Sequence, residues 1–182
     1  MKVYLCLILL LVHPPTQSFE KSILLNTVEI VHKKDIKDYC LDISFKLDKL
    51  GYLSVSPQQF AEFLWIVSYC ESGHQLTASD GISIGLFQMT ADTKRRLGLP
   101  KSNSLESQAE GYFRYLKALG KSRVRSIKNS VDLHCYNLTV RNKDGILSKV
   151  TNSKLDALDL NRDSVITKDD LKLFQNKRLN IK

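Results

Sequence analysis

A single carboxylate occupies one face of a predicted helix that is otherwise apolar. Glu71 follows Val67 by four residues and Leu64 by seven, so the three side chains share one side of the helix's last turns. Burial and the negative end of the helix dipole both favour the neutral form of a carboxyl group. A carboxyl group that keeps its proton near neutral pH can act as the general acid in glycosidic bond cleavage. The alternative is a glutamate that pairs with a buried Lys or Arg, or that turns out to solvent.

The helix that must position Glu71 has start and stop signals. Ser56 can cap it and Gln59 completes a capping box, with Pro57 at the first helical position. Gly73 can end the helix in a left-handed conformation. The sequence therefore predicts a helix that begins after Ser56 and carries Glu71 in its last turn.

Apolar spacing predicts further helices along the chain. They cover residues 36–50, 90–97, 104–120 and a stretch from about 122 to 131. Alternating, strand-like segments are nearly absent. These patterns predict a mainly α domain over residues 19–140, followed by a polar connection at 139–152 and a short helical tail at 150–178.

The segments that follow Glu71 carry more information than the carboxylate alone. Glu71-Ser72 ends the helix, residues 81–90 read GISIGLFQMT, residues 109–116 read AEGYFRYL, and Tyr136-Asn137 comes later. In this order they resemble the catalytic core of the lysozyme-like lytic transglycosylases, within the superfamily of soluble lytic transglycosylases and goose-type lysozymes. These enzymes cleave the MurNAc–GlcNAc bond of peptidoglycan. The resemblance covers roughly residues 55–138 and implies a lysozyme-like helical fold.

The resemblance implies a role for each matching residue. Glu71 would protonate the glycosidic oxygen and then take a proton from the sugar's own 6-hydroxyl group, which closes a 1,6-anhydro ring. The residues implied in holding the carboxyl group and the sugars are Ser72, Gln88, Met89, Tyr136 and Asn137. No cofactor is implied for this chemistry, and the implied partner is the peptidoglycan glycan strand.

A hydrolase that activates water usually carries a second carboxylate across the sugar. Asp80 and Glu110 are the nearest candidates, but neither lies in an apolar stripe, and Asp80 suits a turn before Gly81. The resemblance implies that no second carboxylate is needed, and the chain fits that arrangement. A hydrolytic muramidase is the rival enzyme. A catalytically inactive, calcium-stabilised glycan-binding or assembly module is the rival from another class.

The chain departs from the family pattern at two places. The family usually continues Tyr-Asn with Ala-Gly, whereas Leu-Thr follows here, which puts the pose of Asn137 in doubt and is the best argument for an inactive module. Cysteines also stand beside motif residues. Since Glu71 and Tyr136 should converge in the implied fold, a disulfide between Cys70 and Cys135 is one hypothesis, and two buried free thiols are the other.

A second pattern lies in the tail. The twelve residues from Asp159 place oxygen-bearing side chains at positions 1, 3, 5, 9 and 12, which is the ligand pattern of an EF-hand loop. The predicted calcium ligands are Asp159, Asn161, Asp163, Val165 through its carbonyl, Thr167 and Asp170. Ser164 replaces the usual glycine and Asp170 the longer glutamate, which predicts weaker binding. We expect one structural Ca²⁺ in a small EF-hand-like helix-loop-helix, and a solvated acidic loop is the alternative.

Composition and the amino terminus predict an exported, soluble domain. The 182 residues are 43% hydrophobic and 25% charged, which excludes disordered and fibrous classes. Residues 1–18 have the charged, apolar and small-residue parts of a signal peptide, with an apolar stretch too short for a membrane span. We expect a periplasmic or secreted, wall-associated monomer without a transmembrane anchor after cleavage. The net charge of +8 suits an anionic wall polymer, and no nucleic-acid partner is expected.

Overall fold

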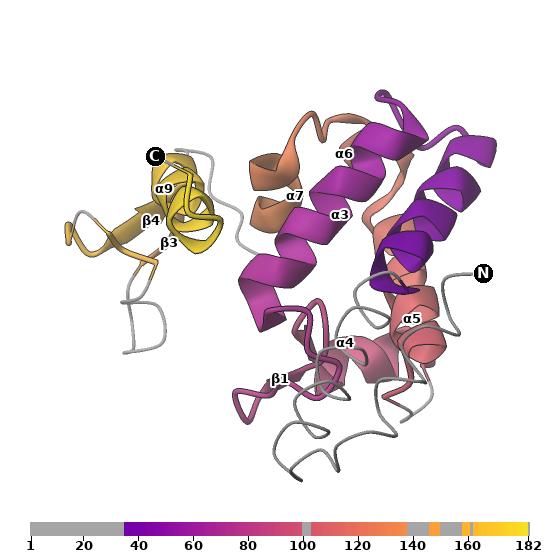
Figure 1. Ribbon diagram of the computed structural model, residues 1–182, viewed down its shortest axis with the longest axis horizontal. Coiled ribbons are helices and arrows are strands. Elements are labelled where there is room, and N and C mark those ends of the chain that lie inside the picture. Colours follow the sequence, from indigo (N-terminus) through magenta and orange to yellow (C-terminus); the bar gives the residue numbers. More distant parts are fainter. Residues whose placement is uncertain (1–34, 100–102, 138–145, 150–157, 161, 182) are drawn as a thin grey trace, which may run out of the picture. The chain divides into compact units, whose positions relative to one another are not determined.

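The computed structural model describes residues 35–99, 103–137, 146–149, 158–160 and 162–181 (Figure 1). The predicted signal peptide at residues 1–18 and the predicted calcium ligand Asn161 lie outside these ranges. Helices dominate, with two small two-stranded sheets, which confirms the mainly α fold class. Within the described ranges, every helix is too short or too polar to cross a bilayer.

Residues 35–49 form the first described helix, the indigo ribbon of Figure 1. The residues of its predicted apolar stripe are all at most 2% exposed: Ile36, Cys40, Ile43 and Leu47. Their burial against the other helices confirms this stripe, and the apolar area removed from water stabilises the helix in the fold.

The helix that carries Glu71 is α3 (Pro57–Ser72), and it begins and ends at the predicted signals. The Ser56 hydroxyl accepts the backbone N–H of Gln59, and the Gln59 side chain accepts the backbone N–H of Ser56. Gly73 follows in the left-handed conformation, with φ of 62°. Both ends of α3 are therefore fixed by local contacts, which holds Glu71 at a defined place.

Two further helices match their predicted caps. In α4 (Ala91–Arg96) the Thr90 hydroxyl accepts the backbone N–H of Thr93. In α5 (Leu105–Leu119) the Ser104 hydroxyl accepts the backbone N–H of Ser107. The inner face of α5 supplies two fully buried residues to the core, Tyr112 and Leu116.

The single helix predicted from about residue 122 to 131 is wrong, because the chain forms two. They are α6 (Lys121–Arg125) and α7 (Ser130–Asn137). The Asn129 side chain accepts the backbone N–H of Asp132, and the Asp132 carboxylate accepts that of Lys128. These contacts satisfy donors that a helix start would otherwise leave unpaired, so they favour a new helix over continuation.

The turn between α6 and α7 brings the end of α7 beside α3. α7 packs against α3 (Figure 1). Ile127, in the turn between α6 and α7, is fully buried in the core. The consequence for function is that Asn137, at the end of α7, lies next to Glu71 at the end of α3.

Two short antiparallel sheets were not predicted. β1 (Ser83–Ile84) pairs with β2 (Met89–Thr90) and forms the hairpin that leads into α4. β3 (Ile146–Lys149) pairs with β4 (Val165–Thr167), so the predicted polar connection contains a strand. Strands of two to four residues are too short to show an alternating pattern, which is why the sequence did not reveal them.

The tail ends in α9 (Lys168–Arg178), which follows β4 directly. Thr167 and Asp170 form a capping box at its start. Leu171 is fully buried in a small apolar cluster that includes Cys135 of α7. α9 packs on both α3 and α7, so the tail is attached to the helices that carry Glu71 and Asn137.

Candidate active site

Glu71 lies at the end of α3 with its side chain 14% exposed. Its Oε1 atom accepts a hydrogen bond of 2.6 Å from Nδ2 of Asn137 and lies 3.0 Å from Nε2 of His134. The carboxyl group is therefore almost withdrawn from water, with the Asn137 amide bonded to Oε1 and an imidazole nitrogen close to the same oxygen. Of the predicted site residues, Asn137 is the one brought into direct contact with Glu71.

Tyr112 sets the direction of the Asn137 amide. The Tyr112 hydroxyl donates to Oδ1 of Asn137 at 3.1 Å, and Nδ2 of Asn137 also donates to the carbonyl oxygen of Phe87 at 3.0 Å. Burial raises the pKa of Tyr112 well above its ordinary value, so the phenol keeps the proton that it donates. The nitrogen side of the amide thus faces Glu71. This role of Tyr112 was not predicted from the sequence.

Gln88 lies in the hairpin loop between β1 and β2 with its side chain turned back onto that loop. Its Nε2 donates to the carbonyl oxygens of Ala78 and Gly85, at 3.0 and 2.8 Å. Gln88 itself has φ of 46°, a left-handed conformation that is uncommon outside glycine. These contacts make Gln88 a support of the loop, with its side chain at the edge of the cleft described below.

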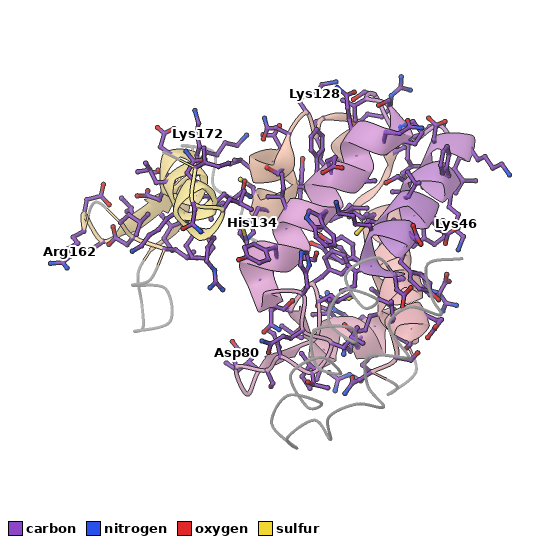
Figure 2. All side chains as sticks on the ribbon, viewed as in Figure 1. Lys46, Asp80, Lys128, His134, Arg162 and Lys172 are labelled. Atoms are coloured by element: carbon purple, nitrogen blue, oxygen red, sulfur yellow. The ribbon has the colours of Figure 1, made fainter. Side chains whose placement is uncertain are left out.

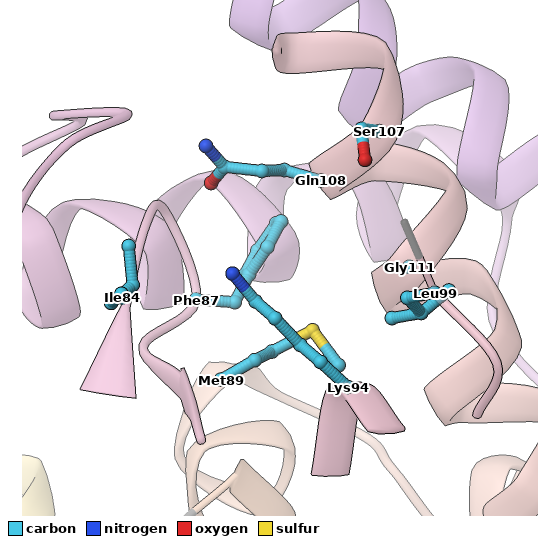
Figure 3. Close-up of a pocket in the computed structure, with 8 residues that line it drawn as sticks. All are labelled: Ile84, Phe87, Met89, Lys94, Leu99, Ser107, Gln108 and Gly111. Atoms are coloured by element: carbon cyan, nitrogen blue, oxygen red, sulfur yellow. The ribbon is translucent and has the colours of Figure 1, made fainter. Parts of the chain in front are cut away.

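Gln108 of α5 clamps the same hairpin and was missed from the sequence. Its Oε1 accepts the backbone N–H of Leu86 at 2.7 Å, and its Nε2 donates to the carbonyl oxygens of Leu76 and Asn103. The residue is 7% exposed. Figure 3 shows the Gln108 amide reaching from α5 toward the loop that carries Phe87 and Met89. These hydrogen bonds therefore fix the position of the hairpin relative to α5.

The hollow drawn in Figure 3 has a volume of only about 10 Å³, bounded by the hairpin, α4 and α5. A space of that size accommodates no more than one water molecule. Leu99 packs closely over Gly111 of α5, since a Cβ at that glycine would lie 2.9 Å from a Leu99 methyl group. This region is packing behind the site and not a sugar-binding cleft.

A larger cleft of about 230 Å³ also borders the hairpin. The described residues that line it are Phe87, Gln88, Met89, Thr90, Thr93, Arg96, Tyr115 and Asn137. They combine apolar surface, hydrogen-bonding groups and one cation, and they include no carboxylate. Asn137 lines this cleft and contacts Glu71, which is not itself among the lining residues.

Ser72 and Tyr136 lie close in sequence to the site but make other contacts. The Ser72 hydroxyl donates to the carbonyl oxygen of Ser68 at 2.9 Å, and the residue is buried. The Tyr136 hydroxyl lies 3.0 Å from the hydroxyl of Ser126, and its carbonyl oxygen accepts from Tyr115. In this structure neither side chain forms a hydrogen bond with Glu71.

The two alternative carboxylates are engaged elsewhere. Asp80 is exposed on the loop before β1 (Figure 2), where its Oδ1 accepts the backbone N–H groups of Ile82 and Ser83. Glu110 pairs with Arg114 on the outer side of α5 at 2.8 Å. Both have adequate roles in local structure, and neither lines the cleft.

All three described cysteines are free thiols, so the hypothesis of a Cys70–Cys135 disulfide is wrong. Both thiols are buried, and burial raises the pKa of each to about 11. Cys40 is buried more deeply, and its pKa rises to about 12. Burial against apolar neighbours explains their presence without a covalent bond.

These thiols are expected to resist alkylation in the folded protein. The thiolate is the reacting form, and a pKa near 11 lowers its fraction at about pH 8 roughly 100-fold relative to an ordinary thiol. Mass spectrometry after iodoacetamide treatment should show Cys70 and Cys135 unlabelled in the native state and labelled in urea without a reductant. Labelling in urea that requires prior reduction would instead reveal a disulfide.

The predicted calcium loop has part of the geometry of an EF-hand loop. Ser164, at its sixth position, has φ of 66°, the left-handed conformation that the usual glycine adopts without strain. The Asp159 carboxylate accepts the backbone N–H groups of Asp163 and Ser164. Asp170 is 1% exposed and caps α9 through Thr167. Among the described residues no group of three or more His, Cys, Asp or Glu side chains could hold a metal ion.

Comparisons with protein-family models, curated proteins and solved structures find no match for this chain. The site is therefore characterised by its own chemistry. It consists of one nearly buried carboxyl group, an amide donor and an imidazole nitrogen beside one of its oxygens, and a mixed polar and apolar cleft lined by the same amide residue.

Proposed function

We propose that the protein is a lysozyme-like lytic transglycosylase that cleaves peptidoglycan with Glu71 as its single acid and base. The observation that carries the proposal is the environment of Glu71, which is 14% exposed and bound by Asn137 at 2.6 Å. A carboxyl group withdrawn from water beside a cleft suits general-acid catalysis. The resemblance of the segments around Glu71, Gln88 and Asn137 to the family's motifs supplies the substrate class.

The reaction begins with proton transfer. The carboxylic acid of Glu71 donates its proton to the glycosidic oxygen as the bond from that oxygen to C1 of the muramic acid breaks. The N–H groups of Asn137 and His134 then stabilise the carboxylate that forms. This assistance lowers the cost of separating charge in a site with little water.

The second step uses the sugar itself. The Glu71 carboxylate takes the proton of the 6-hydroxyl group as that oxygen bonds to C1, which yields the 1,6-anhydro product. Glu71 is thereby returned to its acid form. Asp80 and Glu110, the alternative carboxylates for activating water, are engaged in local contacts, and this supports the internal hydroxyl as the nucleophile.

The cleft has suitable groups for a glycan strand. Met89 and Phe87 offer apolar surface for sugar faces, and Thr90 and Thr93 offer hydroxyl groups. Arg96 supplies a positive charge at the edge of the cleft, which suits the carboxylate-bearing units of a wall polymer. An exported location, as expected from residues 1–18, would bring the enzyme to this substrate.

Product analysis tests the proposed reaction. The purified protein is incubated with peptidoglycan, and the released sugars are examined by mass spectrometry. We expect products that end in 1,6-anhydro-muramic acid, which are lighter by one water than their hydrolytic counterparts. Reducing-end products would identify a hydrolytic muramidase and direct attention to Asp80 or Glu110, while binding without cleavage would identify an inactive module.

We also propose that the loop at residues 159–170 binds one structural calcium ion. Support comes from the left-handed turn at Ser164 and from β4, which occupies positions seven to nine of the twelve-residue EF-hand pattern. Calcium would draw Asp159, Asp163 and Asp170 together, and Asp170 would then turn from its cap on Thr167. The ion would stabilise the tail and take no part in bond cleavage.

Calcium is expected to raise the thermal midpoint of unfolding by several degrees at millimolar concentration, because an ion that binds only the folded state stabilises it. Asp159→Ala should abolish this shift. Asp169→Asn is the matched control, since Asp169 is exposed on α9 and is not a predicted ligand. If calcium does not change the thermal midpoint of unfolding of the unmodified protein, the loop is a solvated acidic loop without a bound ion.

A further inference from the structure

His134 connects Glu71 with the helical tail. The side chain is 2% exposed, and its Nε2 lies 3.0 Å from Oε1 of Glu71. Its Nδ1 lies 3.1 Å from Nε2 of Gln175, which belongs to α9. Figure 2 labels His134 on α7. A buried imidazole with both nitrogens engaged has little freedom to rotate, so it can transmit the position of one partner to the other.

The direction of the Gln175 amide is decided by Ser130. The carbonyl oxygen of Ser130 can only accept a hydrogen bond, and Nε2 of Gln175 lies 3.3 Å from it. The Ser130 hydroxyl donates to Oε1 of Gln175 at 2.8 Å. Both contacts place the NH₂ side of the amide toward His134.

This amide direction assigns the tautomer of His134. Because Gln175 presents an N–H group to Nδ1, that nitrogen must be the acceptor and carries no proton. The proton of the neutral imidazole therefore lies on Nε2, which is 3.0 Å from Oε1 of Glu71. Ser130, Gln175 and His134 form a chain in which each member fixes the orientation of the next.

The chain decides which oxygen of Glu71 can carry the acidic proton. Oε1 accepts the N–H group of Asn137 and lies 3.0 Å from Nε2 of His134, so a proton on Oε1 would face two N–H groups. Among the described residues Oε2 has no hydrogen-bond partner. The proton of the neutral acid is thus directed to Oε2.

We infer that His134, held in one tautomer by Gln175 of the tail, is a positioning residue that directs the acidic proton of Glu71 to Oε2. The inference rests on the proposed function and adds a residue to its machinery. It also makes the tail part of the site, since Gln175 lies 41 residues beyond His134 in the chain. His134 touches the acid and is not expected to touch the substrate.

The docking of α9 does not depend on this contact alone. Lys168 pairs with Asp132 of α7 at 2.7 Å, and Arg178 donates to the carbonyl oxygen of Cys70 at 3.3 Å. Leu171 is fully buried against α7. Gln175→Leu is therefore expected to leave the tail in place while it removes the groups that orient His134.

Nitrogen-15 NMR of the imidazole tests the tautomer directly and requires no activity. In the unmodified protein we expect His134 to show a protonated Nε2 and an unprotonated Nδ1. Gln175→Leu should replace this single form with a mixture. A protonated Nδ1 in the unmodified protein, or an unchanged spectrum in Gln175→Leu, would overturn the inference.

Steady-state kinetics on peptidoglycan tests the consequence for catalysis. His134→Leu and Gln175→Leu are expected to lower kcat about tenfold to 100-fold with KM nearly unchanged, because misplacing a reacting group costs rate rather than binding. His134→Gln, which retains an N–H near the Nε2 position, should recover most of kcat. Lys172→Ala, on the exposed side of α9, is the control and should behave as the unmodified protein.

The outcomes separate the inference from the proposed function. An unmodified protein that does not cleave peptidoglycan contradicts the function, while the NMR measurement still decides the tautomer. Equal loss in His134→Leu and His134→Gln would assign His134 a purely structural role. Thermal unfolding of each variant identifies any that fails to fold, and Gln175→Leu then carries the test because its tail keeps its other contacts.

Discussion

Glu71→Gln is expected to lower the rate of peptidoglycan cleavage at least about 1,000-fold. Removing a general acid costs about 10²- to 10⁴-fold, and in the proposed reaction the same group also serves as the base of the second step. The neutral amide can neither release a proton to the glycosidic oxygen nor accept one from the 6-hydroxyl group. Mass spectrometry of released muropeptides, with initial rates from turbidity of a wall suspension, measures the loss.

The fold of this variant should survive the change. The amide oxygen of a glutamine at position 71 can take the place of Oε1, accept the N–H group of Asn137 and keep its place beside His134. We therefore expect a free energy of unfolding within about 1 kcal/mol of the unmodified protein, with binding to the glycan retained. Loss of cleavage can then be assigned to chemistry and not to unfolding.

A matched control lies on the same helix. Glu62 is exposed on α3, so Glu62→Gln removes one carboxylate without touching the site. Its activity should equal that of the unmodified protein. Cleavage by Glu71→Gln at more than about a tenth of the normal rate would show that another group is the acid.

Gly85→Ala is expected to destabilise the fold by about 3 kcal/mol or more. Gly85 has φ of 92°, which strains any residue with a side chain, and a Cβ there would lie 2.1 Å from Oε1 of Gln108. Gln108 could yield only by breaking its buried hydrogen bonds to Leu86, Leu76 and Asn103. Each buried group left without a partner costs about 1–3 kcal/mol.

Gly81→Ala separates strain from crowding in the same hairpin. Gly81 has φ of 86°, close to that of Gly85, but a Cβ there would meet nothing within 4 Å. Its expected cost is about 1 kcal/mol from backbone strain alone. Urea unfolding of the two variants measures the difference, and equal costs would mean that Gln108 does not clamp the loop.

Local signals predicted the helices that carry the site. Ser56, Gln59 and Gly73 act within a few residues of the backbone groups that they satisfy, so their effect can be inferred from sequence spacing. The buried stripe of α3 followed in the same way, and Glu71 lies at its end as expected. The start of α7 had a comparable signal in Asn129 and Asp132, but a continuing apolar stripe through residue 131 concealed it.

Contacts between distant residues could not be predicted in this way. Gln108 reaches a loop 22 residues earlier, and Gln175 reaches His134 from a different helix. The sequence alone does not distinguish a glutamine or a histidine that is exposed from one that holds a loop in place. The packing of α7 and α9 on α3 decides which of these roles it has.

The long separations within the site have a consequence for the kinetics of folding. Glu71 and Asn137 are 66 residues apart, and the contact from Arg178 to Cys70 spans 108. Loop-closure entropy grows only with the logarithm of loop length, about 0.6 kcal/mol for each doubling, so these separations cost little at equilibrium. They do slow the search for the native contacts, because distant segments must meet before either is stabilised. On refolding, cleavage activity is therefore expected to return after helical structure has formed.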